Sequence, residues 1–286
     1  MCGRSRRTDR AELVIPAAFE YARAGSAEEA IALLVEHGDE AKLVAGGHSL
    51  LPLMKLRLAI PGVLIDIGRV PGLSYIEDRG DEIAIGALAR HHDLETSALL
   101  KEQVPLLAHT AHQVGDPQVR HRGTLGGTLA HGDPASDLPA AVLALGGTLV
   151  AQGPQGAREI AAVDFFRGFL ETALAADEIL VEVRVPKVAG AGWSFQKFNR
   201  RAQDWAIVGV AAVVNGHTGI ALINMGSTPL RAGAVEEAVR SGASASDAAA
   251  VADHGTDPPS DINASSEFRR HLATVLVRRA IEEATS

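Results

Sequence analysis

Cysteine and aromatic residues are scarce in this sequence. Cys2 is the single cysteine among 286 residues, so the chain can form no internal disulfide. It also cannot hold an iron–sulfur cluster with its own thiolates, so any such cluster must belong to a partner. Phe, Trp and Tyr make up 4% of the residues, although 47% are hydrophobic. We therefore expect a core of closely packed Ala, Val, Leu and Gly side chains.

Long apolar runs and basic stripes are also missing. The longest apolar run, near Ile207–Val214, is far shorter than the ~20 residues that span a bilayer. The formal net charge is 27 − 35 = −8, and no basic stripe is visible, which argues against a nucleic-acid partner. Residues 1–12 are expected to be a disordered basic leader, because no apolar stretch of a secretory signal follows their arginines. A cytoplasmic location is the default expectation, with membrane association through partners left open.

The patterning predicts an α+β chain in three regions. An extended stretch at Leu13–Pro16 is followed by a helix at Ala27–His37, which Ser26 caps and Gly38 ends. Strands at Lys42–Ala45 and Val63–Ile67, with a short helix between them, complete a small βαβαβ-like unit.

The other two regions mix strands and helices. A strand at Glu82–Gly86 is followed by one long helix at about Asp93–His112. The passage Gly115–Asp137 has almost no periodicity, and ordered loops longer than about 12–15 residues are usually functional. Further elements are expected at the helix Leu138–Leu145 with Asp137 as a candidate N-cap, at strand Thr148–Ala151, at the edge or half-buried strand Ile179–Val185, at strands Trp193–Phe198, Trp205–Val214 and Ile220–Gly226, and at helices Ala232–Arg240, Ala245–Asp253 and Glu267–Glu283.

Two glycine-rich segments are the strongest candidates for ligand binding. Residues 45–50 (AGGHSL) join a predicted strand to a predicted helix, and residues 122–128 (RGTLGGT) again pair two glycines beside hydroxyl residues. Glycine lets the backbone approach a ligand closely, and a helix start offers N–H groups to phosphate. Neither segment is a Rossmann fingerprint or a P-loop, and a tight turn with a purely steric need for glycine stays open for residues 45–50. Together the two segments suggest a pyrophosphate site without naming the nucleotide.

Other chemistries find less support in the residues. His109 and His112 lie three apart on a predicted helix, but no HExxH or acidic pattern accompanies them, so we expect no metal site. The pair His91-His92 is interpreted as the surface start of a helix. Ser49 comes near the G-x-S-x-G elbow of serine hydrolases, but Leu51 replaces the final glycine.

The two glycine-rich segments resemble the flavin loops of a known family. AGGHSLLP at residues 45–52, followed by MKLR at 54–57, resembles the first flavin loop of the medium subunits of aerobic carbon monoxide dehydrogenases. DPQVR at 116–120 leading into TLGG at 124–127, with GDP at 132–134 and DLPA at 137–140, resembles the second loop. The resemblance covers about residues 13–283, and the flavin domains of xanthine dehydrogenases are the wider relatives.

The resemblance implies a vanillyl-alcohol-oxidase-like, PCMH-type FAD-binding fold of the α+β class. It implies two FAD-binding lobes at residues 13–70 and 71–186, and a C-terminal α+β domain at residues 187–286. The first loop would hold the pyrophosphate through backbone amides, Asp137 would bind a ribose or ribityl hydroxyl, and Leu180 and Lys197 would lie near the flavin ring. The FAD-binding residues implied in this way are Ala45, Gly46, Gly47, His48, Ser49, Leu50, Thr124, Gly126, Gly127, Thr128, Asp137, Leu180 and Lys197.

The resemblance also implies electron transfer, with no catalytic or metal-binding residue in this chain. A large subunit with a molybdenum cofactor would oxidise the substrate, and a small subunit with [2Fe–2S] clusters would pass electrons to FAD here and on to an external acceptor. The assembly would be a dimer of heterotrimers. Carbon monoxide is our first choice of substrate. The alternatives are a related xanthine, N-heterocycle or aldehyde dehydrogenase, or a stand-alone flavin reductase.

Two positions depart from the family pattern. Thr128 stands where the family usually has Asn, which predicts that any contact there is made by the backbone alone. Phe195 stands where many relatives carry Tyr, which keeps ring stacking available but removes a hydroxyl that could tune the flavin.

Overall fold

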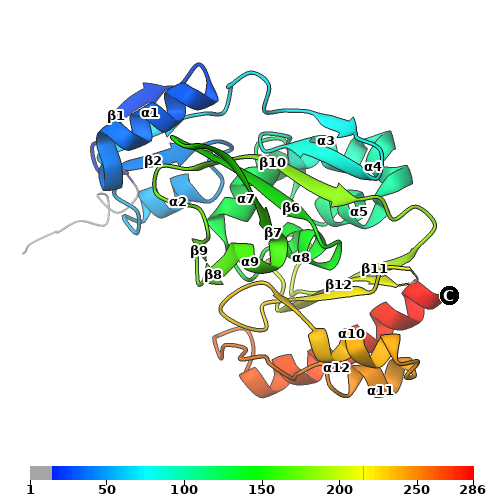
Figure 1. Ribbon diagram of the computed structural model, residues 1–286. Coiled ribbons are helices and arrows are strands. Elements are labelled where there is room, and N and C mark those ends of the chain that lie inside the picture. The colour runs from blue at the N-terminus through cyan, green and yellow to red at the C-terminus, as the bar shows by residue number, and fades with distance from the viewer. Residues whose placement is uncertain (1–14, 215) are drawn as a thin grey trace, which may run out of the picture.

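The computed structural model describes residues 15–214 and 216–286. The leader at residues 1–12, and half of the stretch predicted at Leu13–Pro16, lie outside the described residues. Figure 1 shows an N-terminal lobe, a middle region around a long sheet, and a C-terminal sheet backed by helices.

The N-terminal lobe is a parallel βαβαβ unit, as the sequence predicted. Its sheet has the order β1 (Glu20–Arg23), β3 (Val63–Asp66), β2 (Ala41–Val44). Helix α1 (Ala27–His37) begins where Ser26 accepts a hydrogen bond from the Glu29 amide, and it ends at Gly38 with φ 52°. Helix α2 (Leu50–Lys55) follows β2. Strand β1 lies at Glu20–Arg23, and the two described residues of the extended stretch predicted at Leu13–Pro16, Ile15 and Pro16, belong to no strand.

The middle region is built on a five-stranded antiparallel sheet. Its order is β4 (Ile76–Asp78), β5 (Glu82–Gly86), β10 (Ile179–Pro186), β6 (Thr148–Gly153) and β7 (Gly156–Ala161). Strand β10 is therefore central, so of the two predicted alternatives, an edge strand or a half-buried strand, the structure supports the half-buried one. Its alternation is real, since Val183 and Val185 are fully buried while Arg184 is partly exposed. An alternating pattern indicates that one face of a strand is polar, and it does not indicate whether the strand is central or at the edge of its sheet.

The long helix predicted at Asp93–His112 is divided into three: α3 (His91–Thr96), α4 (Ala98–Gln103) and α5 (Pro105–His112). Ser97 caps α4 by accepting from the Leu100 amide, and Pro105 can only begin a new helix because it has no N–H. The passage predicted as a loop, Gly115–Asp137, contains two short helices. The remaining elements here are α6 (Pro117–Arg120), α7 (Leu125–His131), α8 (Asp137–Ala144), α9 (Ala162–Phe165) and the hairpin of β8 (Phe166–Gly168) and β9 (Glu171–Thr172).

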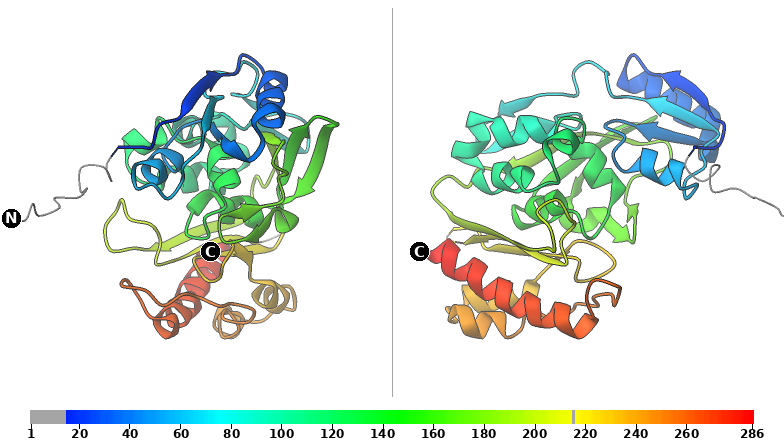
Figure 2. Two further views of the ribbon diagram at one scale, coloured as in Figure 1. Left: turned by 90° about the vertical axis from the view of Figure 1, so that its left-hand side faces the viewer. Right: turned by 180° about the vertical axis from the view of Figure 1, so that it is seen from behind.

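The C-terminal region is an antiparallel sheet covered on both faces. Its order is β11 (Gly192–Phe198), β12 (Val208–Val214), β13 (Gly219–Ile223) and β14 (Leu230–Arg231). Helices α10 (Gly233–Arg240), α11 (Ala245–Ala249) and α12 (Ser266–Thr285) pack on one face, and α8 packs on the other (Figure 2).

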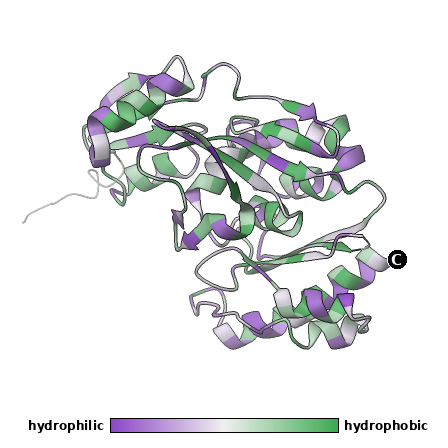
Figure 3. Ribbon diagram, viewed as in Figure 1, coloured by the Kyte–Doolittle hydropathy of each residue, from purple (hydrophilic) through white to green (hydrophobic). Residues whose placement is uncertain are grey.

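Because both faces of this sheet are covered, every residue of β12 is buried. Figure 3 shows hydrophilic and hydrophobic residues alternating along α10 and α12, as expected of helices with one face on a sheet. In the described part of the chain, no helix is both long and apolar enough to cross a membrane.

Candidate functional site

A single cavity collects the residues that the sequence pointed to. Its volume is about 550 Å³, and its lining includes every predicted site residue, from Ala45–Leu50, Thr124–Thr128, Asp137, Leu180 and Lys197. The walls therefore come from the N-terminal lobe, from the middle region and from β11 of the C-terminal sheet. A volume in this range suits an organic cofactor.

The first glycine segment, residues 45–50, leads from β2 to α2 as predicted. Gly47 has φ 79°, which is a left-handed conformation that favours glycine. A Cβ on Gly46 would lie 2.2 Å from the carbonyl oxygen of Arg122, so only glycine lets this turn lie against residues 122–123. None of the N–H groups of residues 46–50 donates a hydrogen bond to another described residue. This turn therefore presents a row of backbone donors at the cavity.

The second glycine segment, residues 122–128, has most of its backbone donors already occupied. It forms the first turn of α7, in which Thr124 is the N-cap and its hydroxyl oxygen accepts from the Gly127 amide at 3.1 Å. The Gly126 amide donates to the carbonyl oxygen of Ala87 at 2.8 Å, and the Thr128 amide donates to that of Thr124 at 3.0 Å. A Cβ on Gly126 would lie 2.5 Å from the Cβ of Ala87. Gly126 therefore permits close packing against residue 87, and the segment offers the cavity few backbone donors.

Asp137 and Lys197 form a buried ion pair across the cavity wall. Lys197 Nζ lies 2.7 Å from Asp137 Oδ2, both side chains are 7% exposed, and Nζ also donates to the carbonyl oxygen of Gln113. The N-cap of α8 is Ser136 rather than Asp137, so the predicted capping role for Asp137 was wrong. Burial raises the pKa of Asp137 to about 6, although Lys197 opposes the shift. The second carboxylate oxygen, Oδ1, is buried without a hydrogen-bond partner, which leaves an acceptor for a ligand hydroxyl.

Leu180 contributes an apolar wall from β10. The register of β10 against β6 shifts between Leu180 and Glu182, directly beside the cavity residues. Phe195, in contrast, does not line the cavity. Its ring is 8% exposed and packs in the core, 6.3 Å from the His109 ring. The predicted stacking at position 195 therefore has no access to this site.

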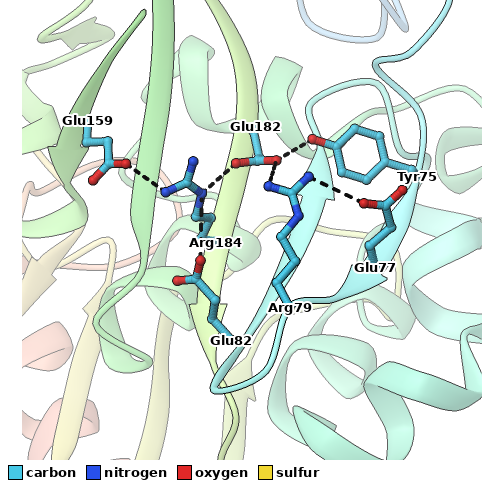
Figure 4. Close-up of polar contacts among 7 residues, drawn as sticks. All are labelled: Tyr75, Glu77, Arg79, Glu82, Glu159, Glu182 and Arg184. Atoms are coloured by element: carbon cyan, nitrogen blue, oxygen red, sulfur yellow. Dashed lines mark hydrogen bonds and ion pairs between the residues drawn. The ribbon is translucent and has the colours of Figure 1, made fainter.

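A polar network fixes β10 just beyond Leu180 (Figure 4). The Glu182 carboxylate accepts from the Tyr75 hydroxyl and pairs with Arg79 at 2.9 Å and with Arg184. The pKa of Tyr75 is raised to about 12, mainly because the hydroxyl is buried and also because it donates to Glu182. Arg184 continues the network to Glu159 at 2.7 Å. These bonds tie β4, β7 and β10 together, so the strand that carries Leu180 is held from both sides.

His91 is the cavity residue whose role the sequence missed. It was expected at the surface, but it is 3% exposed and its Nε2 lies 2.9 Å from Thr128 Oγ1. Burial lowers the pKa of His91 to about 4, so the imidazole is neutral at pH 7. No periodic pattern marks this contact, because it joins the start of α3 to the second glycine segment through tertiary packing. In the described residues no histidine ring nitrogen hydrogen-bonds the Ser49 hydroxyl, so the serine-hydrolase alternative gains no support.

Comparisons with known proteins agree along nearly the whole chain. Residues 17–188 match the FAD binding domain in molybdopterin dehydrogenase, and residues 193–284 match the CO dehydrogenase flavoprotein C-terminal domain. The chain is 41% identical to the carbon monoxide dehydrogenase medium chain of Hydrogenophaga pseudoflava, covering 95% of this chain and 98% of the relative. It is 37% identical to the 6-hydroxypseudooxynicotine dehydrogenase complex subunit alpha of Paenarthrobacter nicotinovorans, covering 94% and 95%. The solved carbon monoxide dehydrogenase of Hydrogenophaga pseudoflava superimposes with a TM-score of 0.91 at 42% identity, over 95% of this chain and 98% of that one.

Proposed function

The chain belongs to the FAD-binding family of the molybdopterin dehydrogenases, and from this premise we propose that the cavity of about 550 Å³ is its FAD site. As a member of this family the protein is the FAD-binding subunit of an oxidoreductase complex. The observation that carries the assignment of the site is the row of N–H groups at residues 46–50, none of which donates to another described residue. Convergent backbone donors of this kind suit the oxygens of a pyrophosphate.

The other walls fit the rest of a dinucleotide. Asp137 Oδ1 is a buried acceptor without a partner, and a ribose or ribityl hydroxyl would satisfy it. Leu180 supplies an apolar surface, and Lys197 holds Asp137 in place from the C-terminal sheet. In this proposal residues 13–70 and 71–186 are the two lobes around FAD, and residues 187–286 close the site from the third side.

The chain's own contribution is binding and orientation. FAD, when bound, supplies the capacity to accept and release electrons. The buried Asp137–Lys197 pair fixes one wall, the glycine turn at residues 46–50 provides donors, and the apolar residues exclude water. The proposal needs no residue of this chain as a general acid or base.

The proposed partners are a large subunit with a molybdenum cofactor and a small subunit with [2Fe–2S] clusters, assembled as a dimer of heterotrimers. The support is that the similar proteins are medium chains or subunits of complexes, and that Cys2 alone cannot bind a cluster. Electrons would leave FAD for an external acceptor. We also propose a cytoplasmic location, which the near absence of cysteine favours.

Carbon monoxide is the substrate that we propose for the complex. The support is 41% and 38% identity to carbon monoxide dehydrogenase medium chains of Hydrogenophaga pseudoflava and Afipia carboxidovorans. Similarity to a 6-hydroxypseudooxynicotine dehydrogenase subunit at 37% identity and to a nicotine 6-hydroxylase medium subunit at 38% makes N-heterocycles the competing substrate class. Reduction of a dye by the purified complex should depend on carbon monoxide. Dye reduction with an N-heterocycle but not with carbon monoxide would replace this substrate and leave the FAD assignment intact.

The FAD site is tested by the cofactor content of the purified full-length chain. Denaturation and chromatography should release about one FAD per chain, since the proposed site would hold one dinucleotide. Folded chain that takes up no FAD, either alone or with its partner subunits, would refute the proposed site.

A further inference from the structure

The His91 imidazole lies directly behind the second glycine segment. Its backbone amide donates to the carbonyl oxygen of Gly123 at 3.0 Å. Its Nε2 lies 2.9 Å from Thr128 Oγ1 and 3.2 Å from the carbonyl oxygen of Thr124. The other ring nitrogen, Nδ1, is buried and has no hydrogen-bond partner among the described residues. His91 is therefore held on three sides by one short stretch of chain.

These contacts select one tautomer of the ring. A carbonyl oxygen can only accept, so the short distance to Thr124 requires a hydrogen on Nε2. The opposite tautomer would bury an Nδ1–H donor without an acceptor and would turn the Nε2 lone pair toward a carbonyl oxygen. Gly123 packs on the Nδ1 edge, since a Cβ there would lie 2.9 Å from Nδ1, so the nitrogen stays shielded.

The tautomer in turn fixes the polarity of the Thr128 hydroxyl. If Nε2–H donates, Thr128 Oγ1 is the acceptor in that bond, and its own hydrogen must point elsewhere. No other group in the described part of the chain hydrogen-bonds this hydroxyl, and Thr128 lines the cavity. Thr124 is 2% exposed and already accepts from the Gly127 amide, so it is less available. Thr128 therefore gives the second glycine segment its most accessible donor.

We propose that His91 is a positioning residue for FAD: by donating from Nε2 to Thr124 and Thr128, it directs the Thr128 hydroxyl hydrogen toward an acceptor oxygen of the bound dinucleotide. The inference rests on the proposed FAD site. It also replaces the expectation of a backbone-only contact at position 128, because the Thr128 amide is occupied inside α7. The low pKa of His91 agrees with this role, since a neutral ring has a single N–H to place.

The first test compares FAD binding by matched variants of the full-length chain, stripped of FAD and titrated with it. His91→Phe removes the donor and keeps a ring, and Thr128→Val removes the hydroxyl and keeps the shape. We expect each to raise the Kd for FAD about 10-fold, the loss typical of one hydrogen bond to a charged or polar ligand atom. His91→Gln, whose amide can reach the Nε2 position, and Thr128→Ser should stay within about 3-fold of wild type.

The double variant decides whether His91 acts through Thr128. If it does, His91→Phe/Thr128→Val should bind FAD no more weakly than the worse single variant. Additive losses, or a wild-type affinity in His91→Phe, would overturn the inference. If wild type itself fails to bind FAD, the proposed FAD site fails instead, so the two failures are distinct.

The second test reads the tautomer without any substitution. In ¹⁵N-histidine-labelled full-length protein, the His91 ring should show the shifts of the neutral tautomer protonated at Nε2, both with and without FAD. This readout survives even if His91→Phe does not fold. A ring protonated at Nδ1 alone would reverse the Thr128 hydroxyl and overturn the proposal.

Discussion

The two glycine segments have nearly the same composition and opposite roles in the structure. The N–H groups of residues 46–50 have no acceptor among the described residues, whereas the amides of residues 125–128 all donate within the protein. Gly47 needs its left-handed φ of 79°, while Gly126 has an ordinary helical backbone and needs only the absence of a Cβ. A paired glycine beside a hydroxyl residue therefore leaves backbone donors open in one place and serves packing in the other.

The difference follows from the element that receives each segment. The first segment connects the parallel strand β2 to α2, and its amides at residues 46–50 donate to no carbonyl oxygen of the described residues. The second lies against residues 87–89, whose carbonyl oxygens accept from the Leu125 and Gly126 amides at 2.9 and 2.8 Å. Of the residues with side chains in the second segment, Thr124 and Thr128 line the cavity.

The largest effect is expected from Gly47→Ala. A side chain at φ 79° is strained and would meet Leu51 Cδ1 at 2.8 Å, which should turn the neighbouring amides away from the cavity. We expect the Kd for FAD to rise at least about 100-fold, because several donors are lost together. The control is Gly72→Ala, which has φ 78° and open space around its Cβ, outside the cavity. Equal FAD loss in both variants would show that strain alone is responsible.

Gly126→Ala should affect stability more than binding. Its Cβ would lie 2.5 Å from the Cβ of Ala87 and 2.7 Å from its carbonyl oxygen, so α7 must move. Overpacking of this kind costs about 1–3 kcal/mol in the free energy of unfolding, which urea titration of the FAD-free chain would measure. A variant with unchanged stability and complete loss of FAD would make the second segment equivalent to the first.

Lowering the pH should reduce the free energy of unfolding through His91, which packs against the second glycine segment. The folded-state pKa of His91 is about 4, below the usual 6.5, so the unfolded chain takes up a proton first as the pH falls. The contribution of neutral, buried His91 to the free energy of unfolding is fully present above pH 6.5 and is lost as the pH falls toward 4. Between pH 6.5 and 5.5 the loss should be about 1 kcal/mol.

The measurement is the difference in unfolding free energy between wild type and His91→Phe, which cannot titrate at this position. This difference cancels the contributions of other groups, including His48, Arg90 and Arg120, which act on His91. A difference that stays constant from pH 6.5 to 5.5 would mean that His91 is not held neutral.

The sequence predicted local features well where they have local causes. The cap of α1 at Ser26, its end at Gly38 and the turn at Gly46-Gly47 depend on neighbouring residues, and each appears as expected. The position of β10 in its sheet depends on contacts between segments far apart in the chain, so the sequence left an edge strand and a half-buried strand as alternatives. The prediction of a single helix at Asp93–His112 was wrong. The apolar periodicity continues through this segment, but Ser97 and Pro105 each begin a new helix.

The site shows the same division. The family motifs identified residues that the structure collects around one cavity, including Leu180 and Lys197 from distant strands. They gave no indication that the second segment's amides are occupied, because the acceptors at Ala87 and Ala89 lie outside any motif. The His91 contact was missed for the same reason, since its partners are more than thirty positions away in the sequence.

Amide hydrogen exchange with and without FAD tests the contrast between the two segments most directly. Amides without acceptors exchange readily, and hydrogen-bonded amides are protected until the structure opens. The account predicts that residues 46–50 exchange fast in the FAD-free chain and become protected when FAD binds, while residues 125–128 are protected in both states. Protection gained at residues 125–128 with none at residues 46–50 would contradict it.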